Sequence, residues 1–202
     1  LLMNEDTGFA YACGSNTCAG GLHMIDVRNP TTPVFAGCFS DDGYTHDGQC
    51  VTYRGPDTAF AGREICFACN ADTLTIVDVT DKQAPVQLSR TTYPGVGYVH
   101  QGWVTDDQAY FLVDDELDET NLSVNTTTHI WDIRSLTSPA RFATFVSASP
   151  AIDHNLFIAG RLAFESNYRA GLRILDVGCV ADGSLTEVGY FDVYPADDRP
   201  RY

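Results

Sequence analysis

The sequence predicts an all-β protein, a β-propeller built from four-stranded blades, and three observations lead to this class. A short apolar phrase ending in Asp recurs four times, with the aspartates at positions 26, 78, 132 and 176. The repeat unit of roughly 40–50 residues holds four short runs rich in Val, Ile, Phe, Tyr and Thr, the residues that strands prefer. No helical periodicity extends beyond about two turns. Repeats of this length without helices are typical of propeller blades, whereas a β-sandwich does not explain the internal period.

The repeats divide the chain, as a single propeller segment over 1–202, into four successive units. In the second unit the strands are expected over 46–53, 64–70, 74–79 and 86–91, because these runs are bounded by Gly, Pro, Asn or Asp. Three of the four repeated aspartates precede a turn that ends in proline, so we expect the Asp carboxylate to cap this turn. The four units cover approximately residues 1–39, 46–91, 100–146 and 154–192.

The composition fits a folded acidic protein. Hydrophobic residues make up 44% of the 202 residues, which is enough to fill a core. The 12 Lys and Arg against 27 Asp and Glu give a net charge of −15, which argues against binding to nucleic acid or to an anionic membrane. No apolar run reaches the length of a transmembrane segment.

Three of the five histidines follow the repeat. His46, His100 and His154 are 54 residues apart, and each precedes the first strand of its unit. The first strand of a propeller blade is the innermost, so the three imidazoles should ring one mouth of the central channel. They can hold a divalent metal ion (Zn, Mn or Ca) or a small polar ligand, with Asp47 or Asp153 assisting. Alternatively, they only hydrogen-bond the backbone of the neighbouring blade.

The remaining two histidines, His23 and His129, lie in third strands. We expect them to be exposed or hydrogen-bonded strand residues without a role in a site.

Loops between the second and third strands should reach the same mouth and form a ligand-binding face. The run from Asp114 to Glu119 holds five acidic residues and Leu117. It lacks the spacing of a dedicated Ca²⁺ loop, so we expect a solvated acidic loop. If the protein is a metal-dependent hydrolase or lyase, Glu116, Asp115 or Glu165 is the candidate base. No nucleophile motif occurs, and catalytic residues stay unknown. The expected face comprises Asn16, Asn70, Gln101, Asp114, Asp115, Glu116, Glu165 and Asn167.

Seven cysteines in a β-rich chain indicate an oxidising compartment. Disulfides between neighbouring strands are favoured, Cys50 with Cys66 and Cys18 with Cys38, although spacing alone leaves the connectivity open. The Cys66–Cys69 spacing lies in a strand, where positions i and i+3 face opposite sides, which disfavours a shared metal ion. Two sequons, at Asn121 and Asn125, are candidate glycosylation sites and also fit a secreted chain.

The phrase at 74–78 and its variants at 22–26 and 172–176 resemble the LVIVD repeat. Further motifs, among them those at 43–47, 100–103 and 152–155, make nearly the whole chain similar to the choice-of-anchor B family. The resemblance implies a propeller and a secreted or surface-anchored location, but no known reaction. Family members are about twice as long as this chain.

We therefore expect the four blades to be part of a larger ring, seven- or eight-bladed and truncated here at both ends. A complete four-bladed propeller is the alternative. Aligning residues 1–3 on 156–158 places a His-Asn pair directly before residue 1, which would supply a fourth ring histidine. The expected partners are the remaining blades or partner subunits, together with a protein or glycan ligand. The expected role is an extracellular binding or structural module.

Overall fold

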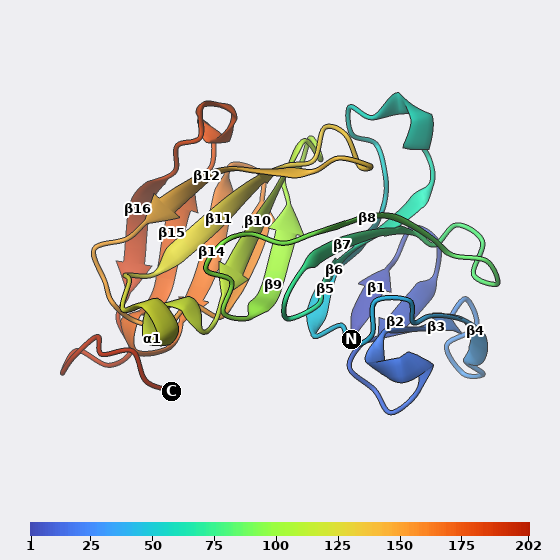
Figure 1. Cartoon of the computed structure of the whole chain (residues 1–202), viewed down its shortest axis with the longest axis horizontal. Helices are drawn as coiled ribbons and strands as arrows, with labels where there is room; N and C mark the ends of the chain where they lie inside the picture. The colour runs from blue at the N-terminus through green and yellow to red at the C-terminus, as the bar shows by residue number, and fades with distance from the viewer.

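The computed structural model describes all 202 residues and confirms an all-β propeller-like fold of four antiparallel sheets (Figure 1). Every sheet has four strands that pair in chain order, and we call the sheets the first to fourth blades. The first two blades comprise β1 Leu2–Asn4, β2 Phe9–Ala12, β3 Leu22–Asp26, β4 Val34–Phe39, and β5 Asp47–Thr52, β6 Glu64–Cys69, β7 Leu74–Asp78, β8 Val86–Thr91. The last two comprise β9 Val99–Val104, β10 Tyr110–Asp115, β11 Thr127–Asp132, β12 Ala140–Val146, and β13 Asn155–Ala159, β14 Leu162–Asn167, β15 Gly171–Asp176, β16 Thr186–Phe191.

Helical structure is confined to short connections. The α-helix α1 covers Asp118–Leu122, between β10 and β11. None of the helices is long and apolar enough to cross a membrane. Four 3₁₀ turns complete the set, at Cys18–Gly20, Thr58–Phe60, Tyr168–Ala170 and Val180–Asp182.

The first strands of the blades lie next to one another, as inner strands of a propeller do. Strand β1 contacts β5, β5 contacts β9, and β9 contacts β13. Residues from all four strands line a common cavity of about 210 Å³. Glutamine side chains connect neighbouring first strands through hydrogen bonds. Oε1 of Gln49 accepts a hydrogen bond from the backbone N–H of Val104 at 2.8 Å, and Oε1 of Gln101 accepts one from that of Leu156 at 2.8 Å.

The repeated aspartates cap their turns, as expected. Each carboxylate accepts the backbone N–H two residues further on, at 2.7–3.0 Å. This contact ends the third strand and turns the chain towards the fourth, so it explains why the repeat phrase closes with Asp. The four residues are Asp26, Asp78, Asp132 and Asp176.

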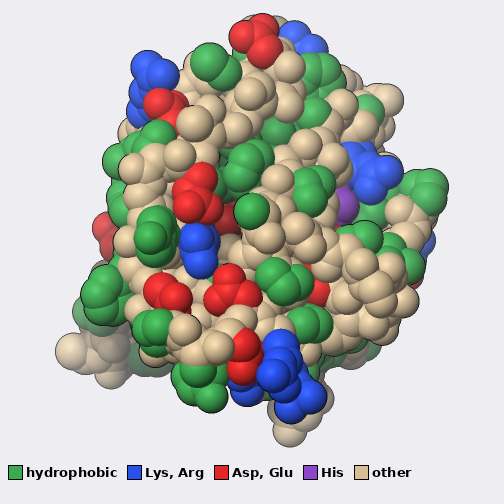
Figure 2. All heavy atoms as spheres, turned by 90° about the vertical axis from the view of Figure 1, so that its left-hand side faces the viewer, with side chains coloured by type: hydrophobic (Ala, Val, Ile, Leu, Met, Phe, Trp, Pro, Cys, Tyr) green, Lys and Arg blue, Asp and Glu red, His purple; other side chains and the backbone are tan.

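The core consists of apolar layers between successive blades. Phe67 of β6 stacks on Phe111 of β10 between the second and third blades, with ring centroids 5.3 Å apart. Strand residues alternate between two faces, so each blade contributes to the layers on both of its sides. On the side of the molecule that carries the fourth blade, apolar side chains reach the surface among acidic and basic ones (Figure 2). Phe157 and Phe191 share the face of the fourth blade that no other blade covers, and both are at least half exposed.

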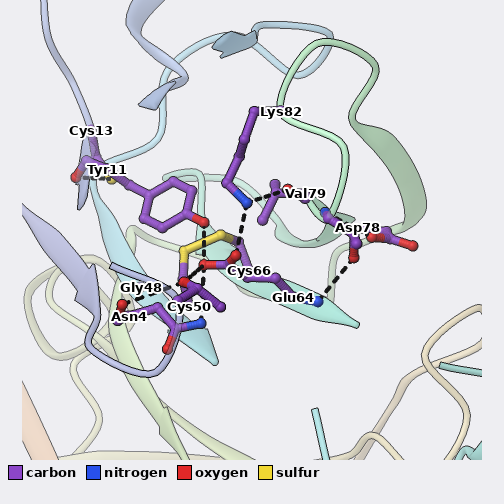
Figure 3. Close-up of a disulfide and its surroundings, with 12 residues drawn as sticks. Asn4, Tyr11, Cys13, Gly48, Cys50, Glu64, Cys66, Asp78, Val79 and Lys82 are labelled. Atoms are coloured by element: carbon purple, nitrogen blue, oxygen red, sulfur yellow. Dashed lines mark hydrogen bonds and ion pairs between the residues drawn. A yellow bond between two sulfur atoms is a disulfide. The ribbon is translucent and has the colours of Figure 1, made fainter. Parts of the chain in front are cut away.

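Two disulfides join the pairs expected from the sequence. Cys50 and Cys66 are directly opposite in the ladder of β5 and β6 and are bonded to each other (Figure 3). Cys18 is bonded to Cys38. Cys66 packs towards the first blade and Cys69 towards the third, which agrees with opposite strand faces. The free cysteines are Cys13, Cys69 and Cys179.

Candidate metal site at the channel mouth

The three repeated histidines form a ladder across three blades. The Nδ1 atom of His46 lies 3.2 Å from the carbonyl oxygen of His100, and Nδ1 of His100 lies 2.7 Å from that of His154. Neighbouring ring centroids are 4.1 and 4.2 Å apart. The hydrogen bonds to the neighbouring blade's backbone are therefore present, and the rings also converge as the repeat predicts.

These hydrogen bonds fix the tautomer of the neutral rings. A carbonyl oxygen only accepts hydrogen bonds, so Nδ1 of His46 and of His100 carries the hydrogen and leaves a lone pair on Nε2. Burial, together with the neighbouring His46 and His154, lowers the pKa of His100 to about 3. Burial also lowers the pKa of His154. At neutral pH His100 and His154 therefore offer uncharged imidazoles.

Glu116 faces two of these rings. Its Oε2 lies 3.6 Å from Nε2 of His100, and its Oε1 lies 3.8 Å from Nε2 of His154. One ligand atom from each of the three residues lies within 4.8 Å of the other two. Zn–N and Zn–O bonds are about 2.0–2.2 Å, so one ion between these atoms reaches all three after small shifts. The hydroxyl of Tyr168 donates to Oε1 of Glu116 at 2.6 Å and orients the carboxylate.

The site opens to solvent on the side of the fourth blade. The His154 side chain is 36% exposed, whereas that of His100 is 4% exposed. His154 and Tyr168 line a pocket of about 360 Å³ together with residues at the ends of β14 and β15. An ion held by three protein ligands here keeps a coordination position towards this pocket.

Other residues of the expected metal set lie outside this group. His46 adds its ring to the ladder but belongs to neither group of ligand atoms close enough to share an ion. Asp47 accepts the N–H of the adjacent Gly48. Asp153 is fully buried, and neither of its carboxylate oxygens has a hydrogen-bond partner in the protein.

The expected ligand-binding face is only partly a surface. Asn70 donates to Asp42 at 2.8 Å, and Asn16 is exposed. Glu165 is buried and accepts from Thr128 at 2.7 Å and from Asn167 at 3.2 Å. Gln101 is occupied by the bond to β13 described above. The sequon residues Asn121 and Asn125 lie in α1 and in the loop that follows it, and their glycosylation stays a prediction.

The expectation of a solvated acidic loop is wrong. Asp114, Asp115, Asp118 and Glu119 are all at most 3% exposed. The reason is that Asp114 and Asp115 are the last residues of β10, where they face the two neighbouring blades in turn, and α1 then folds back across this end of the sheet. Only Glu116 points to the channel mouth.

The expectation that His129 is an exposed or hydrogen-bonded strand residue is also wrong. This side chain is 4% exposed, and neither ring nitrogen has a hydrogen-bond partner in the protein. His23, in contrast, is half-buried and its Nδ1 lies 2.8 Å from Oγ1 of Thr17. The sequence analysis did not identify Tyr168 as a residue of the site. Its position directly after Asn167, a residue of the expected ligand-binding face, is the signal that could have placed it at the channel mouth.

Comparison with known proteins supports the fold and nothing finer. No protein-family model and no curated protein matches the chain. A protein from Lactobacillus plantarum has a similar structure, with a TM-score of 0.65 and 12% identity over 97% of this chain and 56% of its own. The periplasmic gluconolactonase of Pseudomonas aeruginosa also has a TM-score of 0.65, with 11% identity over 96% of this chain and 58% of its own. Dihydro-heme d1 dehydrogenase has a TM-score of 0.61 and 16% identity over 98% of this chain and 37% of its own. The chain thus spans just over half the length of the first two.

Proposed function

We propose that this chain is part of an extracellular β-propeller that binds a divalent metal ion at the channel mouth through His100, Glu116 and His154. The observation that carries the proposal is the convergence of two imidazole Nε2 atoms on one carboxylate, at 3.6 and 3.8 Å. The lone pair on Nε2 of His100 and the negative charge of Glu116 repel each other at this separation, and a cation between them would remove the repulsion. The Nδ1 hydrogen bond of His100 to a carbonyl is the arrangement that orients metal-binding histidines.

The ligand types favour Zn²⁺ or Mn²⁺ over Ca²⁺. Imidazole nitrogen suits zinc and other transition metals, whereas Ca²⁺ takes six to eight oxygen ligands. With three protein ligands and one side towards the pocket, the ion is able to bind a further group, such as a carboxylate or hydroxyl of a protein or glycan partner.

The extracellular location rests on three supports. The two disulfides persist in oxidising compartments. The resemblance to the choice-of-anchor B family implies secretion or surface attachment. The sequence also carries two sequons. We also propose that further blades complete the ring beside the first and fourth blades, since the chain spans only 56% and 58% of two similar structures.

A metal-dependent hydrolase is the second candidate, and the pocket beside His154 favours it. A metal-bound water there would attack a carbonyl group of a substrate held in the pocket. The name of one protein of similar fold, a gluconolactonase, makes lactones and esters the first substrates to try. Asp115 and Glu165 are buried and hydrogen-bonded within the protein, so of the three expected bases only Glu116 adjoins the pocket.

Metal analysis of the protein tests the proposal. We expect His100→Ala and His154→Ala to remove one equivalent of Zn²⁺ or Mn²⁺ per chain relative to the native protein, measured by mass spectrometry of the elements after dialysis. His23→Ala is the matched control, because His23 lies away from Glu116, and it should retain the metal. If both ladder variants keep the native metal content, the proposal is wrong. Ester or lactone hydrolysis that needs this metal separates the hydrolase from the binding module.

A further inference from the structure

A second group of potential ligands lies buried on the other side of the Glu116 segment. Asp115 at the end of β10, Asp118 in α1 and His129 in β11 each bring one ligand atom within 4.8 Å of the other two. The three residues are 0%, 3% and 4% exposed. Nε2 of His129 lies 3.6 Å from Oδ2 of Asp118, which is longer than a hydrogen bond.

Two of these side chains lack the partners that buried polar groups normally have. Neither ring nitrogen of His129 is hydrogen-bonded within the protein, and neither is Oδ1 of Asp118. The His129 ring lies against the ring of Tyr93, with centroids 4.6 Å apart. An imidazole and a carboxylate that are buried and face each other without a hydrogen bond point to a shared ligand between them.

The protein satisfies a buried carboxylate fully elsewhere. Glu64, between the first and second blades, is paired with Lys82 at 2.7 Å and also accepts from Asn4 and Thr7 (Figure 3). Neither Asp115 nor Asp118 has a Lys or Arg partner. Three further carboxyl side chains, those of Asp114, Glu119 and Asp153, are buried nearby, and none of them is paired with a Lys or Arg.

Asp115 is held in place by hydrogen-bond donors, as metal ligands often are. Its Oδ2 accepts from the Tyr93 hydroxyl at 2.6 Å and from the N–H of Gly97 at 2.8 Å. Its Oδ1 accepts the backbone N–H of Tyr98. Such contacts fix the orientation of a ligating carboxylate before the ion arrives.

We propose that Asp115, Asp118 and His129 hold a second divalent cation, of the Zn²⁺ or Mn²⁺ class, buried between the second and third blades. One imidazole and two carboxylates match the ligand preference of these ions. The cation would tie α1 to the ends of β10 and β11. Since Glu116 stands between Asp115 and Asp118 in the chain, this buried ion would also hold Glu116 at the channel mouth. The site is separate from the one at the mouth, and each has its own ligands.

Metal stoichiometry of the full-length protein tests this inference. We expect two equivalents in the native protein and loss of one in His129→Asn, with His154→Ala losing the other and the double variant losing both. His23→Asn is the control, since His23 lies in β3 of the first blade and belongs to neither group of ligands, and it should keep two equivalents. Circular dichroism of each variant checks that the fold is retained.

Cobalt gives a second readout that does not depend on a buried substitution. Native protein stripped with a chelator and titrated with Co²⁺ should bind two equivalents, and loading should raise the unfolding temperature. If His129→Asn does not fold, Asp118→Asn replaces it, since the amide keeps the size of the side chain. A folded variant that retains both equivalents, or native protein that binds only the equivalent lost in His154→Ala, would overturn the inference. Loss of metal in His129→Asn but not in His154→Ala would instead contradict the metal site proposed at the channel mouth.

Discussion

Nζ of Lys82 lies 2.7 Å from Oε2 of Glu64 at the interface of the first two blades, and both side chains are buried (Figure 3). Lys82 also donates to the carbonyl of Val79 and lies over the ring of Phe9, 4.1 Å from its centroid. Glu64 accepts hydrogen bonds from Tyr11 as well. The pair thus anchors the turn after β7 to strands of the preceding blade.

Replacing Lys82 should destabilise the protein strongly. Lys82→Met leaves the Glu64 carboxylate buried without its counter-charge, and breaking a buried pair in this way costs about 3–5 kcal/mol. The double variant with Glu64→Gln should lose less than Lys82→Met alone, because no charge is then buried. Urea unfolding measures both. Arg54→Met is the control, since its ion pair with Asp6 is exposed and contributes about 1 kcal/mol or less.

The repeat made the blades and the histidine ladder predictable from the sequence. The positions of side chains that depend on the loops between strands could not be predicted in this way. The 54-residue spacing placed His46, His100 and His154 on equivalent positions, because each repeat unit folds alike. The position of Glu116 depends on α1, a helix of five residues whose sequence lacks a helical period long enough to detect. His129 looked like an ordinary strand residue because the sequence does not show that α1 covers it.

The two disulfides should differ in their resistance to reductant. Cys50 and Cys66 are at most 4% exposed, whereas Cys38 is exposed and Cys18 half-buried. A mild reductant should therefore open Cys18–Cys38 first while the protein stays folded, which alkylation and peptide mass spectrometry detect. Equal rates of opening for the two bonds would contradict this burial order.

Removing the buried disulfide should lower the stability of the protein. Cys50 and Cys66 close a loop with a sequence separation of 16, and cross-linking a loop of this length stabilises by about 3 kcal/mol in the chain-entropy account. We expect Cys50→Ala combined with Cys66→Ala to lower the free energy of unfolding by about this amount. Cys179→Ala, at an exposed free cysteine, is the control and should unfold like the native protein.

Thiol reactivity should depend on pH differently at Cys13 and Cys179. Burial raises the pKa of Cys13 to about 12, so at pH 8 only about one molecule in ten thousand carries the reactive thiolate at that position. Because a raised pKa lowers the thiolate fraction at any given pH, alkylation of Cys13 should accelerate about tenfold per unit as the pH rises. The exposed Cys179 should react first at pH 8. Mass mapping after brief iodoacetamide treatment checks the order, and early labelling of Cys13 would contradict it.

The two glutamines that join the inner strands should contribute similarly to the free energy of unfolding, one at each of two blade junctions. Gln101→Leu leaves the N–H of Leu156 without its acceptor, and Gln49→Leu does the same to Val104. An unsatisfied buried donor costs about 1–3 kcal/mol, so each variant should lose stability in that range, measured by urea unfolding. Gln87→Leu, at an exposed position of β8, is the control and should change little. A loss at only one junction would show that the two bonds are not equivalent.

The uncovered side of the fourth blade should make the isolated 202-residue chain self-associate. Phe157 and Phe191 lie on the same face of this blade and are 50% and 68% exposed, and an apolar face of a blade is normally buried by its neighbour. We expect light scattering after gel filtration to show oligomers or aggregates rather than a single monomer. Phe157→Ser with Phe191→Ser should reduce the association, because both changes make the uncovered face of the fourth blade polar. A native chain that runs as a stable monomer would mean that these four blades do not need a further neighbour, and it would favour a four-bladed propeller over a larger ring.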